Sequence, residues 1–366
     1  RVEQPSAIPR DAPLADDANL SIALRSSVVR ILGPQEGGRF SIQNHHVAPP
    51  TIYVPLSTLQ RELEEADRAN VLLFSNTRTP HAINGRALLK ELTNSLTAND
   101  LGLTQTVTET KDEHEWRSRR IFFHERVETR LREAPSAYPV LTYFVNELRL
   151  GDRLTPHSMV TAHPKLGAGL AANEIRINDW LAEDLQAKPG DTIELTYFVA
   201  GDRRELTEVS TNVVVKEVVA LEGGYADRTL LPDFPGISDA ANCSDWDPSF
   251  PLDLDLIRDK DETYWDDHRG TPKAFVSYET GKRLWGNRWG DATAIRFGKK
   301  WASVDSLQGA DTRLAIPPNE LGMQWTHLRD EANSAVTQSM DFGGLFIGFG
   351  FFLIGAALLL TAILFV

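Results

Sequence analysis

Apolar residues fill the last 25 positions of the chain, whereas they alternate with polar residues through most of the preceding part. Residues 342–366 read FGGLFIGFGFFLIGAALLLTAILFV, with no charged residue and with Thr361 as the only hydroxyl. About 20 consecutive apolar residues, at about 1.5 Å per residue, are enough to cross a bilayer as a helix. The pattern therefore predicts a transmembrane helix at 342–366 that follows a large domain of globular composition.

The N-terminal third shows short β-forming runs between amphipathic stretches. The runs predict strands at Arg39–Gln43, Thr51–Pro55 and Ala69–Ser75. Ser57 and Gln60 have the spacing of a capping box, which predicts a helix at Thr58–Asp67. Asn84-Gly85 interrupts the chain before a second predicted helix at Ala87–Leu96. This β-α-β-α order predicts an open sheet with helices on one face.

The rest of the globular part mixes strands with short helices. Alternating or β-rich runs predict strands at Thr104–Thr110, Glu115–Arg119, Pro139–Glu147, Ser158–Ala162, Glu174–Ile177, Thr271–Tyr278 and Ala292–Phe297. Helices are predicted at Phe122–Arg132, Asp179–Gln186, Leu254–Tyr264 and Glu279–Trp285. Asn178 is a good N-cap for the second of these helices. The long alternating runs Thr192–Val199 and Thr207–Ala220 predict a hairpin around Gly201-Asp202 that projects as a β-rich lobe.

These elements predict an α+β fold with mixed sheets, helices on one face and two or three subdomains. We expect an N-terminal α/β subdomain at 1–137, a β-rich central subdomain at 138–232 and a C-terminal subdomain with an acidic loop at 233–335. The transmembrane helix at 342–366 completes the chain. The length of the chain allows this number of domains, and 42% hydrophobic residues can build their cores.

Charge and cysteine content narrow the class of protein. A net charge of −13 disfavours nucleic acid as a partner, because such binding needs a basic surface. Cys243 is the only cysteine, which excludes an internal disulfide and a cysteine-based zinc site. The segment Arg329–Asp341 carries one Arg against three acidic residues, so the positive-inside rule favours an extracytoplasmic location for residues 1–341.

Both ends of the sequence suggest an excerpt of a longer protein. The chain opens at Arg1 rather than at a methionine, and it is still apolar at Val366, with no basic cluster behind the helix. We therefore expect further segments on either side.

The familiar catalytic motifs are missing from the sequence. It contains no G-x-x-x-x-G-K-[ST] phosphate loop, no H-E-x-x-H zinc motif and no G-x-S-x-G nucleophile elbow. We therefore expect a chain without enzymatic activity and without a cofactor of its own. Any ATP-dependent step would take place on a separate chain.

An acidic stretch between residues 245 and 267 is the best candidate for a metal site. Hard carboxylate oxygens in a loop suit Ca²⁺, and Asp253, Asp255 and Asp259 are the candidate ligands. The EF-hand pattern is absent, however, and Arg258 and Lys260 lie among the acids. A solvated loop linked by ion pairs is the alternative interpretation.

Aromatic and glycine residues offer two further candidates. Trp265, Trp285, Trp289 and Trp301 form either a platform for ligand stacking or part of a core. In the membrane helix, Gly344, Gly348 and Gly355 predict a face that packs closely against another helix, although glycine is common in membrane helices generally.

Three segments of the chain are distinctive together: IRINDWLAEDLQAKPGD from Ile175, LLPDFPGISDA from Leu230 and ETYWDDHRGTPKAFVSYETGKRLWGNRWGDATAIRF from Glu262. They resemble the large FtsX-like permeases of bacterial ATP-binding-cassette systems. DFGGLFIGFGFFLIGAALLLTAILF from Asp341 is similar to the second membrane helix of those permeases. IYVPLSTLQRELEEADRANVLLF from Ile52 resembles a strand-helix-strand segment of MacB-type periplasmic domains.

The resemblance implies a permease subunit in the bacterial inner membrane. Its large extracytoplasmic domain would be moved by a separate cytoplasmic ATPase, and a second permease half, identical or different, would complete the assembly in membrane lipid. The extracytoplasmic substrate stays open, and the family has no catalytic residues in this domain. The alternative is a membrane-anchored extracytoplasmic binding module that uses the acidic loop for Ca²⁺, and a membrane-anchored hydrolase is a third hypothesis.

Overall fold

A computed structural model of the chain describes residues 2–3, 21–42, 50–74, 84–201, 206–248, 250–298, 314, 316–339 and 342–365. The chain divides into two compact units. One unit contains residues 3–21 and 78–323, and the other contains residues 1–2, 22–77 and 324–366. The fold is of the α+β class, as the sequence predicts. The predicted subdomain boundaries stay predictions, but strand pairing runs across the one at 232/233, since residues 294–296 pair with 138–140 and residues 274–276 pair with 160–162.

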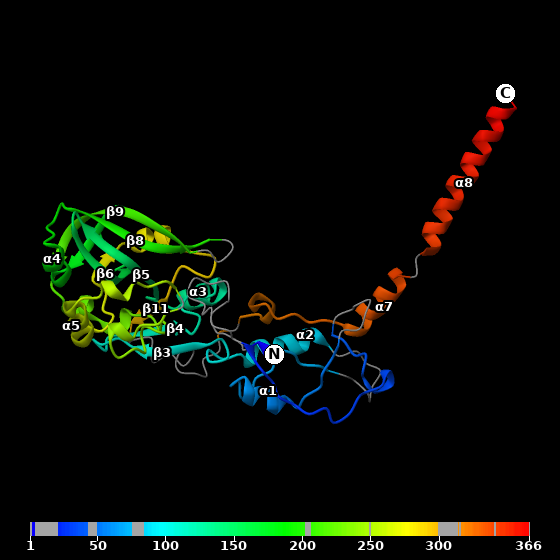
Figure 1. Ribbon diagram of the computed structural model, residues 1–366, viewed down its shortest axis with the longest axis horizontal. Helices are drawn as coiled ribbons and strands as arrows, with labels where there is room; N and C mark the ends of the chain where they lie inside the picture. Colours follow the sequence, from blue (N-terminus) through cyan, green and yellow to red (C-terminus); the bar gives the residue numbers. More distant parts are fainter. Residues whose placement is uncertain are drawn as a thin grey trace. The chain divides into compact units, whose positions relative to one another are not determined.

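A nine-stranded sheet forms the framework of the larger unit. In sheet order its strands are β3 (Leu103–Val107), β4 (Glu113–Ser118), β11 (Ala294–Gly298), β5 (Tyr138–Leu150), β6 (Arg153–Ala162), β10 (Ala274–Val276), β7 (Glu174–Asn178), β9 (Leu206–Val219) and β8 (Thr192–Ala200). A further pairing between β5 and β8 brings Leu148 opposite Leu195. Strands β5, β6, β10, β7, β9 and β8 therefore close into a six-stranded barrel, whose strands β5, β6, β8 and β9 are seen together in Figure 1.

The barrel combines two parallel pairs with antiparallel ones. β10 runs parallel to β6, and β7 runs parallel to β9, whereas the other neighbours in the ring are antiparallel. The predicted hairpin of β8 and β9 is confirmed, with Thr196 opposite Ser210. Its projection as a separate lobe is wrong, because β8 also pairs with β5, and β9 also pairs with β7.

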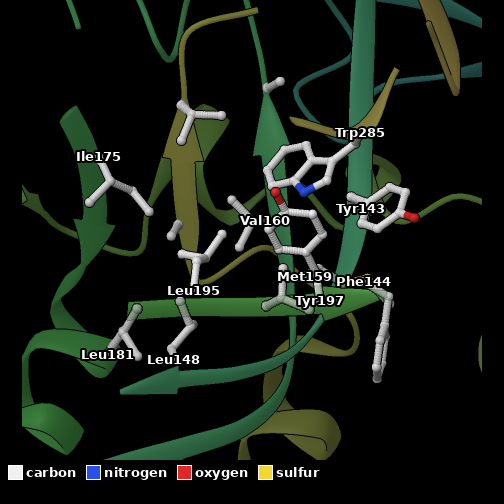
Figure 2. Close-up of a cluster of buried hydrophobic side chains, with 14 of the residues drawn as sticks. Tyr143, Phe144, Leu148, Met159, Val160, Ile175, Leu181, Leu195, Tyr197 and Trp285 are labelled. Carbon is white, nitrogen blue, oxygen red and sulfur yellow. The ribbon is translucent and has the colours of Figure 1, made fainter. Parts of the chain in front are cut away.

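Apolar side chains from many strands meet in one core. Leu148, Val160 and Leu195 come from β5, β6 and β8 and are completely buried in the same cluster, which Figure 2 shows. The Trp285 ring stacks on Tyr143, with ring centroids 5.4 Å apart and planes within 2° of parallel. β8 buries every second residue near its start, as an alternating strand with one solvated face should.

The described α-helices of the larger unit are short. They are α2 (Gly85–Ser95), α3 (Glu125–Arg132), α4 (Asp179–Leu185), α5 (Asp259–His268) and α6 (Tyr278–Trp285). Asn178 caps α4 as predicted, since its side-chain oxygen accepts a hydrogen bond of 2.8 Å from the Leu181 amide. Asn84 caps α2 in the same way through the Ala87 amide. The segment predicted as one helix at Leu254–Tyr264 divides into a 3₁₀ turn at Leu254–Leu256 and α5.

The smaller unit differs most from the sequence prediction. Among its described residues between 39 and 74, none lies in a strand, so the predicted strands at Arg39–Gln43, Thr51–Pro55 and Ala69–Ser75 are wrong wherever they are described. Gln43 and Ser75 lie outside the described residues. β-forming composition does not make a strand unless another strand pairs with it. The open sheet predicted from these strands is wrong for the same reason.

The described residues of the smaller unit contain three α-helices and a 3₁₀ helix at Pro34–Glu36. The α-helices are α1 (Leu56–Glu62), α7 (Leu328–Ser339) and α8 (Phe342–Leu364). The predicted capping box is wrong, because α1 begins after Pro55 with no side-chain cap and ends five residues earlier than expected. Near the N-terminus, β1 (Val2–Glu3) and β2 (Ser21–Ile22) pair as a two-stranded sheet.

Candidate functional site

A small cavity lies where β6 meets α5 and the long segment between β9 and α5. It has a volume of about 30 Å³. Its walls combine apolar and ionisable side chains: Pro156, His157, Ser158, Met159, Cys243, Trp246, Ile257, Asp261, Tyr264, Trp265, Arg269, Gly270, Thr271 and Lys273. We call it the Lys273 cavity. Concave sites that hold buried ionisable groups are the usual candidates for binding.

Lys273 is the most unusual member of this wall. The side chain is almost completely buried, just before β10. Its Nζ lies 3.6 Å from Oδ1 of Asp261 and over the rings of Trp180 and Tyr264, at 4.1 and 4.8 Å from their centroids. Burial lowers the pKa of Lys273 to about 8, against the opposing effect of Asp261. At neutral pH the ammonium is therefore held by one carboxylate and two aromatic faces.

Asp261 belongs to an ion network that fixes the start of α5. Arg258 donates through Nε to Oδ2 of Asp261 at 2.6 Å and through Nη2 to Oδ2 of Asp184 at 2.8 Å. Thr155 on β6 donates to the same Asp184 oxygen at 2.5 Å. The network joins α5, α4 and β6, so it sets the distance between the two sides of the Lys273 cavity.

His157 and Trp246 carry buried polar atoms without a partner. His157 Nε2 lies 2.7 Å from the carbonyl oxygen of Asp253, which can only accept a hydrogen bond, so Nε2 carries the proton. His157 Nδ1 is then an acceptor, and it has no hydrogen-bond partner among the described residues. The Trp246 Nε1–H donor has no partner among them either. Burial lowers the pKa of His157, which keeps the imidazole neutral at neutral pH. Phe144 packs against both rings, with centroids 5.9 and 6.3 Å away.

Two residues of the wall have backbone angles that side chains rarely adopt. His157 has φ 39°, and Arg269, which ends α5, has φ 54° and ψ −146°. Such conformations cost roughly 1–3 kcal/mol each and concentrate at binding sites. Arg269 holds its position by donating to the Ala241 carbonyl at 3.0 Å.

Cys243 faces the same cavity as a buried thiol. Burial, followed by the nearby Glu262 carboxylate, raises its pKa to about 12. The thiolate is the nucleophilic form of cysteine, so Cys243 is an inert, protonated side chain at neutral pH.

Trp265 and Cys243, which the sequence singles out, line the cavity, whereas the candidate metal ligands Asp253, Asp255 and Asp259 do not. Asp253 Oδ1 accepts a hydrogen bond of 3.1 Å from the Asp255 amide in a 3₁₀ turn, and Asp259 is the first residue of α5. Among the residues that the structure describes, no group of three or more His, Cys, Asp and Glu side chains could hold a metal ion. The Asp253 carbonyl, rather than its carboxylate, contacts the cavity wall through His157.

The structure also shows where the candidate tryptophans and glycines of the sequence analysis lie. Trp265 and Trp285 are buried in the core, which agrees with the core interpretation; Trp289 is half-buried, and Trp301 lies outside the described residues. Gly344, Gly348 and Gly355 lie in α8.

Helix α8 is long and apolar enough to cross a membrane. Its span Phe346–Leu364 has a mean hydropathy of 2.5, and none of it is buried by the rest of the chain. A Cβ atom added at Gly348 or Gly355 would meet nothing within 4 Å. The transmembrane helix that the sequence predicts is thus present as a helix, and Gly348 and Gly355 are open to a neighbour.

Sequence reasoning missed Lys273, His157 and Trp246. One signal was available for Lys273, because it is a charged residue within a run that predicts a β-strand, Thr271–Tyr278. No local pattern marks His157 or Trp246, since their unpaired atoms arise from contacts between distant segments. No family model matches the chain, and no curated protein matches it.

Proposed function

We propose that the chain is a permease component of an ATP-driven transport or mechanotransmission system in a bacterial inner membrane. The observation that carries the proposal is α8, an apolar helix with no buried residue in its span Phe346–Leu364, in which Gly348 and Gly355 are open to another helix. In lipid, small residues allow close helix packing, so an open glycine face favours assembly with further membrane helices over simple anchoring.

The larger unit supports the same proposal, because its described residues form a well-filled core with a small cavity. Its core is filled, and the Lys273 cavity holds about 30 Å³, far below the roughly 300–1,000 Å³ of ordinary small-molecule sites. A rigid barrel with a filled interior can transmit force. We propose that it lies outside the cytoplasm as a MacB-like core with further subdomains, that a cytoplasmic ATPase moves it, and that a second permease half completes the complex.

The first test concerns the side of the membrane. In a Cys243→Ser background, Asp152→Cys places a single thiol in the turn between β5 and β6, where Asp152 is exposed. We expect a membrane-impermeant maleimide to label this thiol in intact spheroplasts as fully as in lysed cells. Labelling that appears only after lysis would place the barrel in the cytoplasm and contradict the proposal.

The second test concerns assembly, and α8 offers a matched pair of variants. Gly348 and Gly350 are both open to space, but two residues in a helix are about 200° apart and so lie on opposite faces. We expect Gly348→Leu to reduce co-purification of the full-length protein with an ATP-binding-cassette ATPase, and Gly350→Leu to leave it unchanged. Equal behaviour of the two variants, or purification without any ATPase, would argue for a simple anchor.

A further inference from the structure

Strand β9 has an open edge along its first half. On one side it pairs with β8 from Leu206 to Val214. On its other side the neighbour is β7, whose pairing with β9 begins only at Val214. Among the residues that the structure describes, no strand therefore lies beside residues 206–213 on that side.

Two hydrogen bonds show which backbone groups face the open edge. The Val214 N–H donates to the Asn173 carbonyl, which precedes β7, whereas the Val215 N–H donates to the Asp191 carbonyl, which precedes β8. Successive residues of a paired strand direct their backbone groups to opposite sides. The even-numbered residues before Val214 therefore direct N–H and C=O away from β8. Within the described part of the chain, three of them have no partner for these groups: Glu208, Ser210 and Asn212.

This edge lacks the features that usually protect one. Natural edge strands are protected by proline, lysine, a bulge or extreme shortness. Residues 206–212 read LTEVSTN, without proline or lysine, and their register with β8 is unbroken. The only charge is Glu208, whose Oε1 accepts a hydrogen bond of 2.6 Å from Asn146 Nδ2. The side chains of Val209 and Ser210 are exposed, so another strand can reach the edge.

The sequence of the edge is complementary to itself. In an antiparallel pair with Val209 opposite its own counterpart, the outward-facing Glu208 of each copy lies opposite the outward-facing Ser210 of the other. Thr207 of each copy then lies opposite Thr211. Threonine pairs are among the favourable cross-strand combinations, whereas like charges directly opposite are unfavourable. This register contains the first and avoids the second.

We propose that two copies of the chain associate through β9, as an antiparallel strand pair centred on Val209. Both copies present the same edge, so a two-fold axis satisfies the two edges at once. A strand pair of this length is small beside the roughly 1,600 Å² of a typical stable interface, so it forms between chains that α8 holds in one membrane. Only for that membrane does the inference rest on the proposed permease role, and beyond that role it identifies the second half as an identical chain.

Disulfide crosslinking of the full chain in liposomes tests the register, in a Cys243→Ser background. Opposite residues of a non-hydrogen-bonded antiparallel pair have Cα atoms about 4.5 Å apart, which a disulfide can span. We expect Val209→Cys to give a covalent dimer under mild oxidation. Thr211→Cys is the matched control on the same face of β9. The two copies of residue 211 would lie about 14 Å apart along the strands, so we expect roughly tenfold less dimer.

A second set of variants tests the backbone contact. Ser210→Pro removes an N–H that faces the open edge and that the barrel does not use, whereas Ser210→Ala keeps it. In the Val209→Cys protein we expect Ser210→Pro to lose most of the dimer and Ser210→Ala to retain it. Thr207→Cys combined with Thr211→Cys should form the dimer that Thr211→Cys alone does not, because these positions face each other across the pair.

Three results would overturn the proposal. They are no dimer from Val209→Cys, equal dimer from Val209→Cys and Thr211→Cys, which indicates random collision, and equal dimer from Ser210→Pro and Ser210→Ala. The first two do not involve Ser210→Pro, so they remain decisive even if that variant does not fold. Co-purification of an ATPase is measured separately, so failure of the permease proposal leaves this result unaffected.

Discussion

Arg296 on β11 and Glu115 on the adjacent strand β4 form a buried ion pair, with Nε and Oε2 2.6 Å apart and both side chains at most 4% exposed. The Arg296 guanidinium also contacts Asp227 Oδ2 through Nη1 at 2.9 Å, in the segment that follows β9. This cluster ties the open part of the sheet to the chain that leads into the Lys273 cavity.

We expect Arg296→Met to lower the free energy of unfolding by about 3–5 kcal/mol, because the buried Asp227 carboxylate loses its cation and the buried Glu115 keeps only Arg117. Urea unfolding of the full chain in detergent measures the change. Arg149 is the control: it pairs with Glu147 at 2.8 Å on β5, but both side chains are partly exposed. Arg149→Met should cost at most about 1 kcal/mol. Similar costs for the two variants would contradict a buried, energetically important cluster.

The barrel core predicts that truncating a buried side chain lowers the free energy of unfolding far more than truncating an exposed one. Leu195 is completely buried in the cluster of Figure 2, and truncation of such a leucine leaves a cavity. We expect Leu195→Ala to lower the free energy of unfolding by about 2–5 kcal/mol. Val209, on the paired strand β9, is 36% exposed, so Val209→Ala should change it by about 0.5 kcal/mol or less. A small effect at Leu195 would mean that the barrel interior is loosely packed.

Close packing of α6 on β6 depends on a glycine. A Cβ atom at Gly281 would lie 2.1 Å from Cβ of Ala162, whereas one at Gly298 would meet nothing within 4 Å. Overpacking of this kind typically costs about 1–3 kcal/mol. We therefore expect Gly281→Ala to lower the thermal unfolding midpoint by several degrees, and Gly298→Ala to leave it nearly unchanged. An unchanged midpoint in Gly281→Ala would show that α6 can move away from β6 freely.

The pKa of Lys273 predicts how stability depends on pH. Below pH 8 the lysine is charged in both the folded and the unfolded chain, so folding bears the full cost of burying the charge. Between pH 8 and 10.5 the unfolded chain binds more protons than the folded one, and stability rises with pH. The rise attributable to Lys273 is about 3 kcal/mol.

Urea unfolding at pH 7 to 10.5 measures the free energy of unfolding of the wild type and of Lys273→Met. The difference between the two values at each pH separates the rise due to Lys273 from the effect of other titrating groups. Lys260 is the control, because it pairs with Asp184 near the same network but is half exposed. Lys260→Met should keep the wild-type rise. If Lys273→Met keeps it as well, the lysine is not buried as a cation.

The acidic loop predicts a negative result with Ca²⁺. The Asp253 carboxylate already accepts the Asp255 amide, and among the described residues no group of three or more His, Cys, Asp and Glu side chains could hold a metal ion. We expect Ca²⁺ at millimolar concentration to leave the thermal midpoint of the full chain unchanged, with Mg²⁺ as the control. A selective rise with Ca²⁺ would favour the alternative of a calcium-dependent binding module.

Local signals explain which elements the sequence could predict. Asn178 caps α4 through a bond three residues away, and β8 and β9 are neighbours in the chain with clear alternation. α8 follows from composition alone. Each of these elements is determined by residues that are close in sequence, so a pattern within a short window identifies it.

The closed barrel and the cavity depend on contacts between distant residues. The sequence predicts a strand at Thr271–Tyr278, but nothing in it shows that β10 is inserted between β6 and β7. Likewise, the Lys273 environment is built from Trp180, Asp261 and Tyr264, which have no common motif. The exposed run Val71–Phe74 shows the reverse case, where β-forming residues are present but no described strand forms.

The position of β10 in the chain imposes an order on folding during synthesis. β10 has only three residues, Ala274–Val276, yet it fills the gap between β6 and β7. Until these residues leave the ribosome, β6 and β7 each present an unpaired edge, which is the feature that promotes association between incomplete chains. A nascent chain halted before residue 274 would therefore leave both of these edges open, and one extended beyond residue 276 can close the barrel.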